Sequence, residues 1–239
     1  QERNQLEEEL RHAIDNGSLQ LHYQPVVDTV SEQISGFEAL LRWNHPTHGW
    51  ISPEKFVPVA EDAGLIVAIG EWAIRQACSD LARWPEKVRC AVNVSPLQFA
   101  DPNLPDMIAK TIAAAGIKPS RLELEITESM LLHHLDQVVE KMRLLNRMGF
   151  YIALDDFGTG YSSLSYLREL PLHKLKIDQA FVRDIRSDKN DRVIVETIIA
   201  MARLMELDVI AEGVEEEYQL NFLKEKGCYQ YQGYYFDKP

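Results

Sequence analysis

The chain has 239 residues, of which 46% are apolar and 26% are charged. Its length and composition are therefore those of a globular protein with a full core, and they exclude a disordered chain, a collagen-like repeat and a coiled coil. With 25 basic and 37 acidic residues the net charge is −12, and a surface of this sign does not attract the phosphate backbone of a DNA or RNA polymer.

The predicted elements begin with a surface helix, after which strands and helices alternate. The helix places Leu6 and Leu10 on one face and ends at the Asn16-Gly17 turn. Eight strand-like stretches follow: Leu19–Gln24, Ile34–Trp43, Val88–Val94, Leu122–Thr127, Tyr151–Asp155, Lys174–Ile177, Asp208–Glu212 and Tyr229–Gln232. The connection between the first two, around Asp28–Gln33, is too short for a parallel crossover, which predicts an antiparallel first pair.

Helical patterns lie between most of the strands: Leu65–Trp84, Leu104–Ala115, Leu131–Met148, Ser163–Leu167, Asp191–Glu206 and Glu216–Lys226. Eight strands with helical crossovers predict an α/β fold, a (β/α)8 TIM-like barrel with an antiparallel first strand, since such barrels typically have about 250 residues. A doubly wound parallel sheet is the alternative. No linker rich in proline, glycine or serine interrupts residues 1–239, so we expect one domain.

Cysteine usage and hydropathy indicate the compartment. Cys78, Cys90 and Cys228 form no C-x-x-C pair, which argues against a disulfide framework or a cysteine zinc site and favours a reducing environment. There is no apolar run of about 18 residues and no signal peptide, so we expect a cytoplasmic domain without direct membrane contact. Because the chain starts at Gln1 within a charged helical pattern, we also expect it to be a domain of a longer multidomain signalling protein; the sequence leaves open whether that protein is tethered to a membrane.

Polar side chains stand at or near the downstream ends of otherwise apolar strands. They are Asn93, Glu125, Asp155, Asp156, Lys176, Glu212 and Gln232, and Glu38 lies within the second predicted strand. In a barrel these strand ends converge on one mouth, where the active site lies. A lone carboxylate is more often a helix cap or a solvated residue, Asp155 and Asp156 alone could form a turn, and Glu123 and Glu128 could be surface strand residues. Recurrence at so many strand ends nevertheless favours a common site.

Crowded carboxylates repel one another, so a shared site needs positive charge. A set of carboxylate and amide oxygens without Cys or His suits Mg²⁺ or Mn²⁺. The five carboxylates and Lys176 carry a net charge of −4, which two divalent cations would neutralise. Two ions about 3.5–4 Å apart would clamp a phosphodiester and ionise a water, with Asp155 as the bridging ligand.

Other common catalytic arrangements are missing from the sequence. The seven histidines fit no metal-binding spacing and are expected at the surface or in loops. No phosphate-binding P-loop and no G-x-S-x-G nucleophile elbow is present, which disfavours nucleoside triphosphate hydrolysis and serine catalysis.

The segment Glu38-Ala39-Leu40, followed by Leu41-Arg42-Trp43, resembles the signature of the EAL domain family of cyclic di-GMP phosphodiesterases. Eight further motifs match in order: Tyr23–Pro25, Phe56–Glu61, Asn93–Ser95, Glu125–Glu128, Asp155–Ser163, Lys174–Asp178, Ala211–Glu215 and Gln232–Phe236. The three-letter string alone is nonspecific, whereas the ordered series is highly specific. The resemblance implies hydrolysis of one phosphodiester bond of bis-(3′,5′)-cyclic di-GMP to linear pGpG, dependent on Mg²⁺ or Mn²⁺.

The resemblance also implies a role for each site residue. Glu38, Asn93, Glu125 and Asp155 would bind the first ion, and Asp155, Asp156 and Glu212 the second. Lys176 would hold the attacking water beside the catalytic Asp156 and Glu212. Gln232 would fix the cluster of metal ions and water, and Gln24, Arg42 and Gln232 would bind substrate. Phe157, Gly158, Thr159 and Gly160, anchored by Glu128, would form a loop that couples homodimerisation to the metal site.

Two other functions remain as alternatives. One is a catalytically silent receptor that binds cyclic di-GMP and signals through a partner. The other is a Mg²⁺-dependent barrel enzyme that acts on a small organic acid, which the carboxylates alone would allow but the ordered motifs disfavour.

Overall fold

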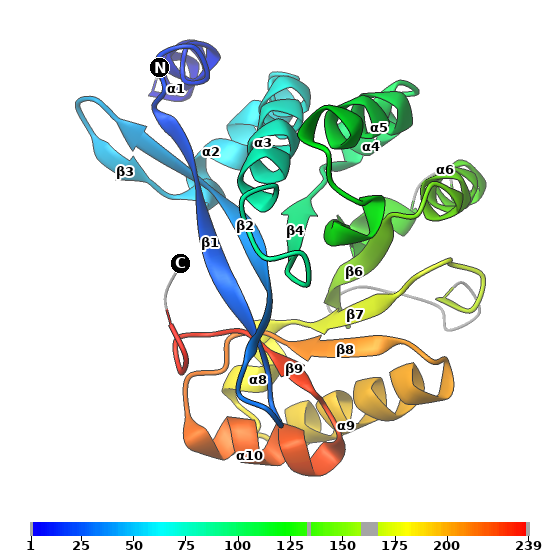
Figure 1. Cartoon of the computed structure of the whole chain (residues 1–239). Helices are drawn as coiled ribbons and strands as arrows, with labels where there is room; N and C mark the ends of the chain where they lie inside the picture. Colours follow the sequence, from blue (N-terminus) through cyan, green and yellow to red (C-terminus); the bar gives the residue numbers. More distant parts are fainter. Residues whose placement is uncertain (1, 133–134, 159–166, 238–239) are drawn as a thin grey trace.

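The computed structural model of the chain describes residues 2–132, 135–158 and 167–237. Within these ranges nine strands form one sheet in the order β1-β9-β8-β7-β6-β5-β4-β2-β3, and pairing of β1 with β2 closes it into a barrel (Figure 1). The strands are β1 Leu19–Asp28, β2 Ile34–His45, β3 Gly49–Ile51, β4 Arg89–Asn93, β5 Leu122–Thr127, β6 Tyr151–Phe157, β7 Lys174–Ile177, β8 Asp208–Ala211 and β9 Gln230–Tyr231. The predicted α/β barrel is confirmed.

The first strand is the irregular one, as its short connection predicts. β1 runs antiparallel to both neighbours: Val26 pairs with Gly36 of β2, and Val27 pairs with Tyr231 of β9. β3 also pairs antiparallel with β2 at the edge of the sheet, and all remaining neighbours are parallel. The carboxyl ends of seven strands therefore open at one mouth.

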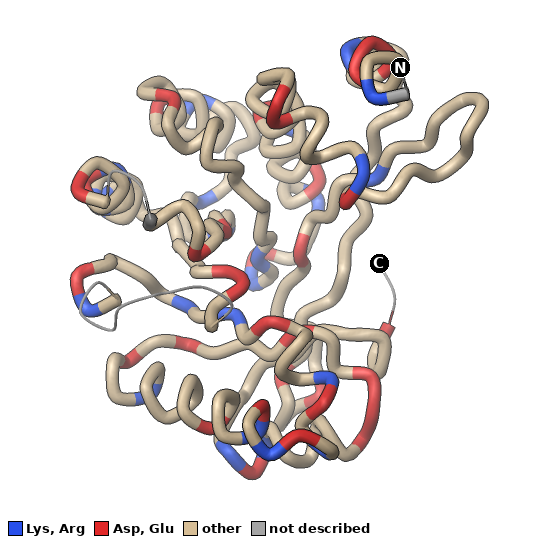
Figure 2. The backbone as a smooth tube through the Cα atoms, turned by 180° about the vertical axis from the view of Figure 1, so that it is seen from behind, with Lys and Arg blue, Asp and Glu red and all other residues tan. Residues whose placement is uncertain are grey.

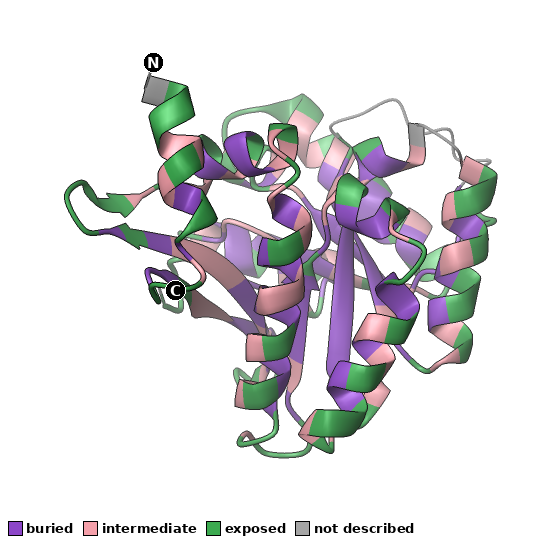
Figure 3. Ribbon diagram, turned by 90° about the horizontal axis from the view of Figure 1, so that it is seen from above, coloured by how far each residue is buried: buried purple, intermediate pink, exposed green. Residues whose placement is uncertain are grey.

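The described helices pack around the outside of the barrel. They are α1 Glu2–Arg11, α2 Pro53–Asp62, α3 Ile66–Leu81, α4 Pro96–Ala100, α5 Leu104–Ala115, α6 Leu135–Arg147, α8 Gln179–Arg183, α9 Lys189–Leu204 and α10 Glu217–Lys226, with 3₁₀ turns at Pro119–Arg121 and Glu128–Leu132. Buried residues lie on the strands and on the inner faces of the helices (Figure 3). A separate small core that includes Leu10, Trp43 and Phe56 lies between α1, β2 and α2.

Several short elements have no counterpart in the prediction. β3, α4 and α8 have three to five residues each, too few for a hydrophobic period to be recognised. The ten-residue helix α2 also has no counterpart in the prediction, because Pro58 in its interior is unfavourable in a helix and obscures the helical pattern. The predicted helix Leu131–Met148 is wrong at its start, because residues 128–132 form a 3₁₀ turn before α6. The predicted helix Ser163–Leu167 lies outside the described residues except for Leu167.

Acidic and basic residues are interspersed over the helices when the molecule is seen from behind (Figure 2). One surface prediction is wrong: His45 is 5% exposed, and its ring lies against Glu9, with Nε2 3.1 Å from Oε2. Cys78, Cys90 and Cys228 are buried free thiols. In the part of the chain that the structure describes, no helix combines the length and apolarity needed to cross a bilayer.

Candidate active site

Eight polar side chains from separate strands lie together at the mouth of the barrel. They are Glu38 of β2, Asn93 of β4, Glu125 of β5, Asp155 and Asp156 of β6, Lys176 of β7, Glu212 just after β8, and Gln232 just after β9. A cavity of 340 Å³ opens onto this group and is lined by Glu38, Asn93, Asp155, Glu212 and Gln232 among others. The convergence predicted from the strand ends therefore occurs.

Lys176 is the centre of the cluster and is fully buried. Its Nζ lies 2.7 Å from Glu125 Oε2, 2.7 Å from Glu212 Oε1, 3.2 Å from Asp155 Oδ2 and 3.4 Å from Glu38 Oε2. One ammonium group thus contacts four carboxylates that come from β2, β5, β6 and the residue after β8. Since a buried carboxylate without a countercharge is strongly unfavourable, Lys176 lets the group assemble.

Two amide side chains hold Glu38 in place from either side. Asn93 Nδ2 donates to Glu38 Oε1 at 2.8 Å, and Gln232 Nε2 donates to Glu38 Oε2 at 2.6 Å. Gln232 Nε2 also donates to Glu212 Oε1 at 3.0 Å, which links the two carboxylates. With its Nδ2 engaged by Glu38, Asn93 keeps its amide oxygen as the donor atom for a cation.

Asp155 and Asp156 join one site although they are consecutive in a strand. Successive side chains of a regular strand point to opposite faces. Here Asp156 has φ of 55°, a left-handed conformation that Asp tolerates better than most residues, and the β6–β7 register shifts between Leu154 and Phe157. The local turn ends the alternation, and the Asp156 amide donates to Asp155 Oδ1 at 2.9 Å.

Burial and mutual repulsion shift the pKa values of the carboxyl groups in the cluster. Burial raises the pKa of Glu212 to about 8 and that of Asp156 to about 6, and in both cases the nearby Asp155 adds to the increase. Burial and Glu38 also raise the pKa of Glu125, although Lys176 opposes them. For Glu38, burial is outweighed by Lys176 and the amides of Gln232 and Asn93, so its pKa is lowered. Such shifts are typical of functional sites.

The donor atoms fit divalent cations. Two groups of carboxylates have oxygens within 4.8 Å of one another: Glu38, Glu125 and Asp155 form the first, and Asp155, Asp156 and Glu212 form the second. Asp155 belongs to both. The donors are all hard oxygens, which suit Mg²⁺ or Mn²⁺. Among the described residues these were the only such groups of His, Cys, Asp and Glu.

Gln24 and Arg42, which with Gln232 are expected to bind substrate, line the same cavity. Gln24 of β1 pairs in register with Glu38, and Arg42 of β2 lies further along the strand that carries Glu38. Arg42 donates through Nη1 to the carbonyl of Leu41 at 2.8 Å. The cavity wall also contains Gln179, Glu215 and Tyr234, to which the sequence analysis assigned no role. Glu215 and Tyr234 lie inside matched motifs, so their position in those motifs was the available signal.

The loop predicted to couple to the site is described in part. The Gly158 amide donates to Glu128 Oε2 at 3.0 Å, which ties the end of β6 to the turn after β5, and Phe157 is buried. Thr159 and Gly160 lie outside the described residues. The alternative that Glu123 and Glu128 are surface residues is wrong, because they are 2% and 3% exposed.

Comparison with protein families gives a match over nearly the whole chain. The family model described as the EAL domain matches residues 7–239. The bifunctional diguanylate cyclase/cyclic di-GMP phosphodiesterase MucR of Pseudomonas aeruginosa is 44% identical over 243 residues, which cover 100% of this chain and 36% of MucR. The cyclic di-GMP phosphodiesterase NbdA of the same organism is 42% identical over 239 residues, covering 98% of this chain and 30% of NbdA. The chain thus spans about a third of the length of these relatives.

A solved structure is similar over nearly the full length of both chains. The structure of the PaMucR phosphodiesterase in complex with c-di-GMP superposes with a TM-score of 0.95 at 44% identity, covering 98% of this chain and 97% of the other. Barrel closure, strand order and the mouth of the barrel are therefore those of a known fold.

Proposed function

The chain belongs to the EAL domain family, as its ordered motifs indicate, and from this premise we propose that it hydrolyses one phosphodiester bond of cyclic di-GMP to give linear pGpG. Relatives that carry this domain are named cyclic di-GMP phosphodiesterases. The activity, substrate and partners of the whole protein are part of the same proposal.

The observation that carries the proposal is the pair of carboxylate groups that share Asp155 beside Lys176. Five acidic side chains against one lysine leave a net charge of −4, which two dications would cancel. We assign Glu38, Asn93, Glu125 and Asp155 to the first ion and Asp155, Asp156 and Glu212 to the second, either Mg²⁺ or Mn²⁺. When bound, such ions would activate a water and stabilise charge on the phosphoryl oxygens.

The side chains of the protein would orient the attacking water, the carboxylates and the substrate. Lys176 donates into the centre of the carboxylate cluster, where it would hold the attacking water in line with the phosphorus and limit the excess negative charge. Gln232 fixes Glu38 and Glu212 relative to each other through one amide nitrogen. The planar guanidinium of Arg42 suits a phosphate of the substrate, and Gln24 lies beside it at the cavity wall.

A turnover assay tests the proposal directly. Purified protein is mixed with cyclic di-GMP and Mn²⁺ or Mg²⁺, and the products are separated by chromatography. We expect pGpG only in the presence of metal. Binding of the dinucleotide without turnover at any metal concentration would favour the receptor function, and failure to bind any guanine dinucleotide would favour an enzyme of another substrate class.

Metal affinity is expected to increase with pH. Because the pKa of Glu212 is raised to about 8 and that of Asp156 to about 6, both carboxyls hold protons below these values, and an arriving cation must displace them. Displacement of one proton predicts about a tenfold gain in affinity per pH unit below pH 8. Calorimetric titration of Mn²⁺ at pH 6, 7 and 8, in buffers of different ionisation heat, measures both the affinity and the protons released. An affinity independent of pH would contradict the assignment of Glu212.

The same shifts predict how the stability of the metal-free protein depends on pH. A carboxyl whose pKa is raised on folding binds more protons in the native state, so stability is lost as pH rises from about 5 to about 8. Thermal unfolding across this range, with and without Mn²⁺, should show the loss in the metal-free sample and its reversal by the metal.

The variant Arg42→Ala is expected to weaken substrate binding more than turnover. A charge-assisted hydrogen bond to phosphate contributes about 1.5–3 kcal/mol, so KM should rise by roughly 10–100-fold while kcat changes less. Arg42→Lys should recover only part of the loss, because a lysine lacks the planar fork. Arg75→Ala, on the exposed face of α3, is the control and should leave KM unchanged. A fall in kcat alone would place Arg42 elsewhere in the mechanism.

The loop after β6 is proposed to link the metal site to a homodimer interface. Gly158, the last described residue before this loop, donates its amide to Glu128, which directly follows Thr127, the partner of Asp155 in the sheet. This hydrogen bond supports a structural connection between the turn after β5 and the metal ligands. Light scattering of the protein with and without metal tests the oligomeric state.

A further inference from the structure

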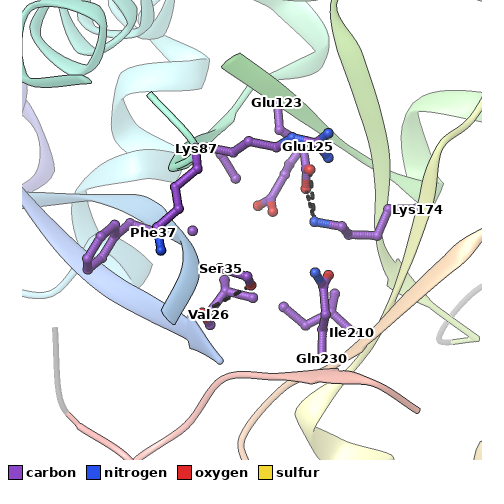
Figure 4. Close-up of a pocket in the computed structure, with 12 residues that line it drawn as sticks. Val26, Ser35, Phe37, Lys87, Glu123, Glu125, Lys174, Ile210 and Gln230 are labelled. Atoms are coloured by element: carbon purple, nitrogen blue, oxygen red, sulfur yellow. Dashed lines mark hydrogen bonds and ion pairs between the residues drawn. The ribbon is translucent and has the colours of Figure 1, made fainter. Parts of the chain in front are cut away.

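The interior of the barrel below the metal site is polar and incompletely filled. Side chains alternate along a strand, so the residues two positions before the site residues also point inward. They include Gly36, Ala91 and Ala153, with small or absent side chains, and the charged Glu123 and Lys174. A barrel interior is usually filled by large branched residues. Here it contains a cavity of 220 Å³, which Glu123, Glu125 and Lys174 line together (Figure 4).

Glu123 and Lys174 form a second buried ion pair below the one at the site. Lys174 Nζ donates to both carboxylate oxygens of Glu123, at 2.8 Å each. The two residues are 2% and 8% exposed. They come from β5 and β7, and the intervening strand β6 presents Ala153 at this level, whose small side chain lets the pair meet across it.

The strand register places Lys174 level with Glu125, although it bonds to Glu123. Ala153 of β6 pairs with Glu125 on one side and with Lys174 on the other. Lys174 nevertheless contacts Glu123, two residues before Glu125 in β5, while Lys176 contacts Glu125 at 2.7 Å. Two inter-strand spacings separate Glu125 from Lys174 by about 10 Å between Cα atoms, a distance that a lysine and a glutamate side chain span together.

We propose that Glu123 is a positioning residue that holds the Lys174 ammonium away from Glu125, so that Glu125 remains available as a metal ligand. Glu125 already accepts from Lys176 with one oxygen. A second ammonium on the same carboxylate would compete with a dication for its remaining lone pairs and would add a positive charge beside the metal. The inference rests on the metal-dependent function proposed above.

Other acceptors in the cavity do not replace Glu123. The buried amide oxygen of Gln230 has no hydrogen-bond partner among the described residues and lies in the same cavity (Figure 4). It is neutral, however, and an ammonium binds more strongly to a carboxylate. When Glu123 is removed, Glu125 is therefore the expected new partner of Lys174.

The test measures Mn²⁺ affinity by calorimetry, without substrate, in wild type, Glu123→Leu and the double variant Glu123→Leu/Lys174→Met. Partners that orient a metal ligand typically change affinity by 10–100-fold. We expect Glu123→Leu to lose about tenfold or more in affinity, and the double variant to bind Mn²⁺ within about threefold of wild type. Glu86→Leu, which breaks the exposed pair with Lys118, is the matched control and should bind like wild type.

The outcomes separate this inference from the proposed function. Unchanged affinity in Glu123→Leu, or an equal loss in the double variant, overturns the positioning role. Glu123→Leu leaves a buried lysine unpaired and can destabilise the protein, so the melting temperature of each metal-free variant is also recorded. The inference is supported if the single variant is destabilised and the double variant regains both the Tm and the Mn²⁺ affinity of wild type. If wild type binds Mn²⁺ but does not cleave cyclic di-GMP, the proposed function fails while the role of Glu123 is still decided by the variants.

Discussion

Replacing Glu38 by alanine is expected to abolish turnover, with a loss of about 10³-fold or more, equivalent to about 4 kcal/mol of transition-state stabilisation. The carboxylate belongs to the first group of potential metal ligands and is 4% exposed. Its loss also removes the acceptor of the Asn93 amide and one of the two acceptors of the Gln232 amide, which keeps its hydrogen bond to Glu212. The rate of pGpG formation and the Mn²⁺ affinity of the variant measure the two consequences separately.

Two further variants give this prediction its controls. Glu38→Gln keeps the size of the side chain but removes its charge, and we expect it to be nearly as inactive, with a smaller effect on folding. Glu86→Ala, at an exposed position, should have the activity of wild type. A rate near that of wild type in Glu38→Ala, at saturating metal, would refute the assignment of Glu38 as a ligand.

The variant Lys176→Ala is expected to reduce kcat by roughly 10²–10³-fold while KM changes by less than about threefold, the pattern of an interaction made mainly in the transition state. Its Nζ lies within 3.4 Å of four carboxylates and is fully buried, so it can reach a water held among these carboxylates. Steady-state kinetics at saturating Mn²⁺ test the split.

Lys176→Ala has a second consequence, for stability. In the metal-free variant the buried carboxylates face one another without a countercharge, and breaking a buried pair typically costs about 3–5 kcal/mol. We therefore expect a clear fall in the melting temperature that Mn²⁺ largely reverses. A change confined to KM would place Lys176 among the substrate contacts, and an unchanged melting temperature without metal would show that the carboxylates are neutralised by protons instead.

Much of this site is predictable because its residues follow local rules. Strand-length apolar runs and helical periods indicate the barrel, and the short connection before β2 indicates an antiparallel first pair, since backbone geometry sets both patterns. Residues at parallel strand ends must share one mouth, so Glu125, Lys176 and Glu212 can be grouped without coordinates. The order of motifs along the chain then identifies the family.

Contacts across the barrel could not be predicted in this way. Glu123 and Glu125 each bond to a lysine 51 residues later, and Gln232 bonds to Glu38 across 194 residues. Which lysine meets which glutamate depends on the stagger of β5, β6 and β7, and no residue pattern encodes that stagger. The burial of Glu123 has the same origin, because a strand residue at the sheet face lies in water or in the barrel according to how the sheet closes.

By itself, then, the sequence of this protein determined the fold class, the set of polar residues at the mouth and the family, because periodicity, residue chemistry and motif order are properties of the chain. Only the tertiary structure decided that Lys176 contacts four carboxylates at once, that the left-handed Asp156 turns two consecutive aspartates toward one site, and that a second ion pair lies beneath the first. These depend on barrel closure, which brings distant strands to fixed distances and excludes water from between them.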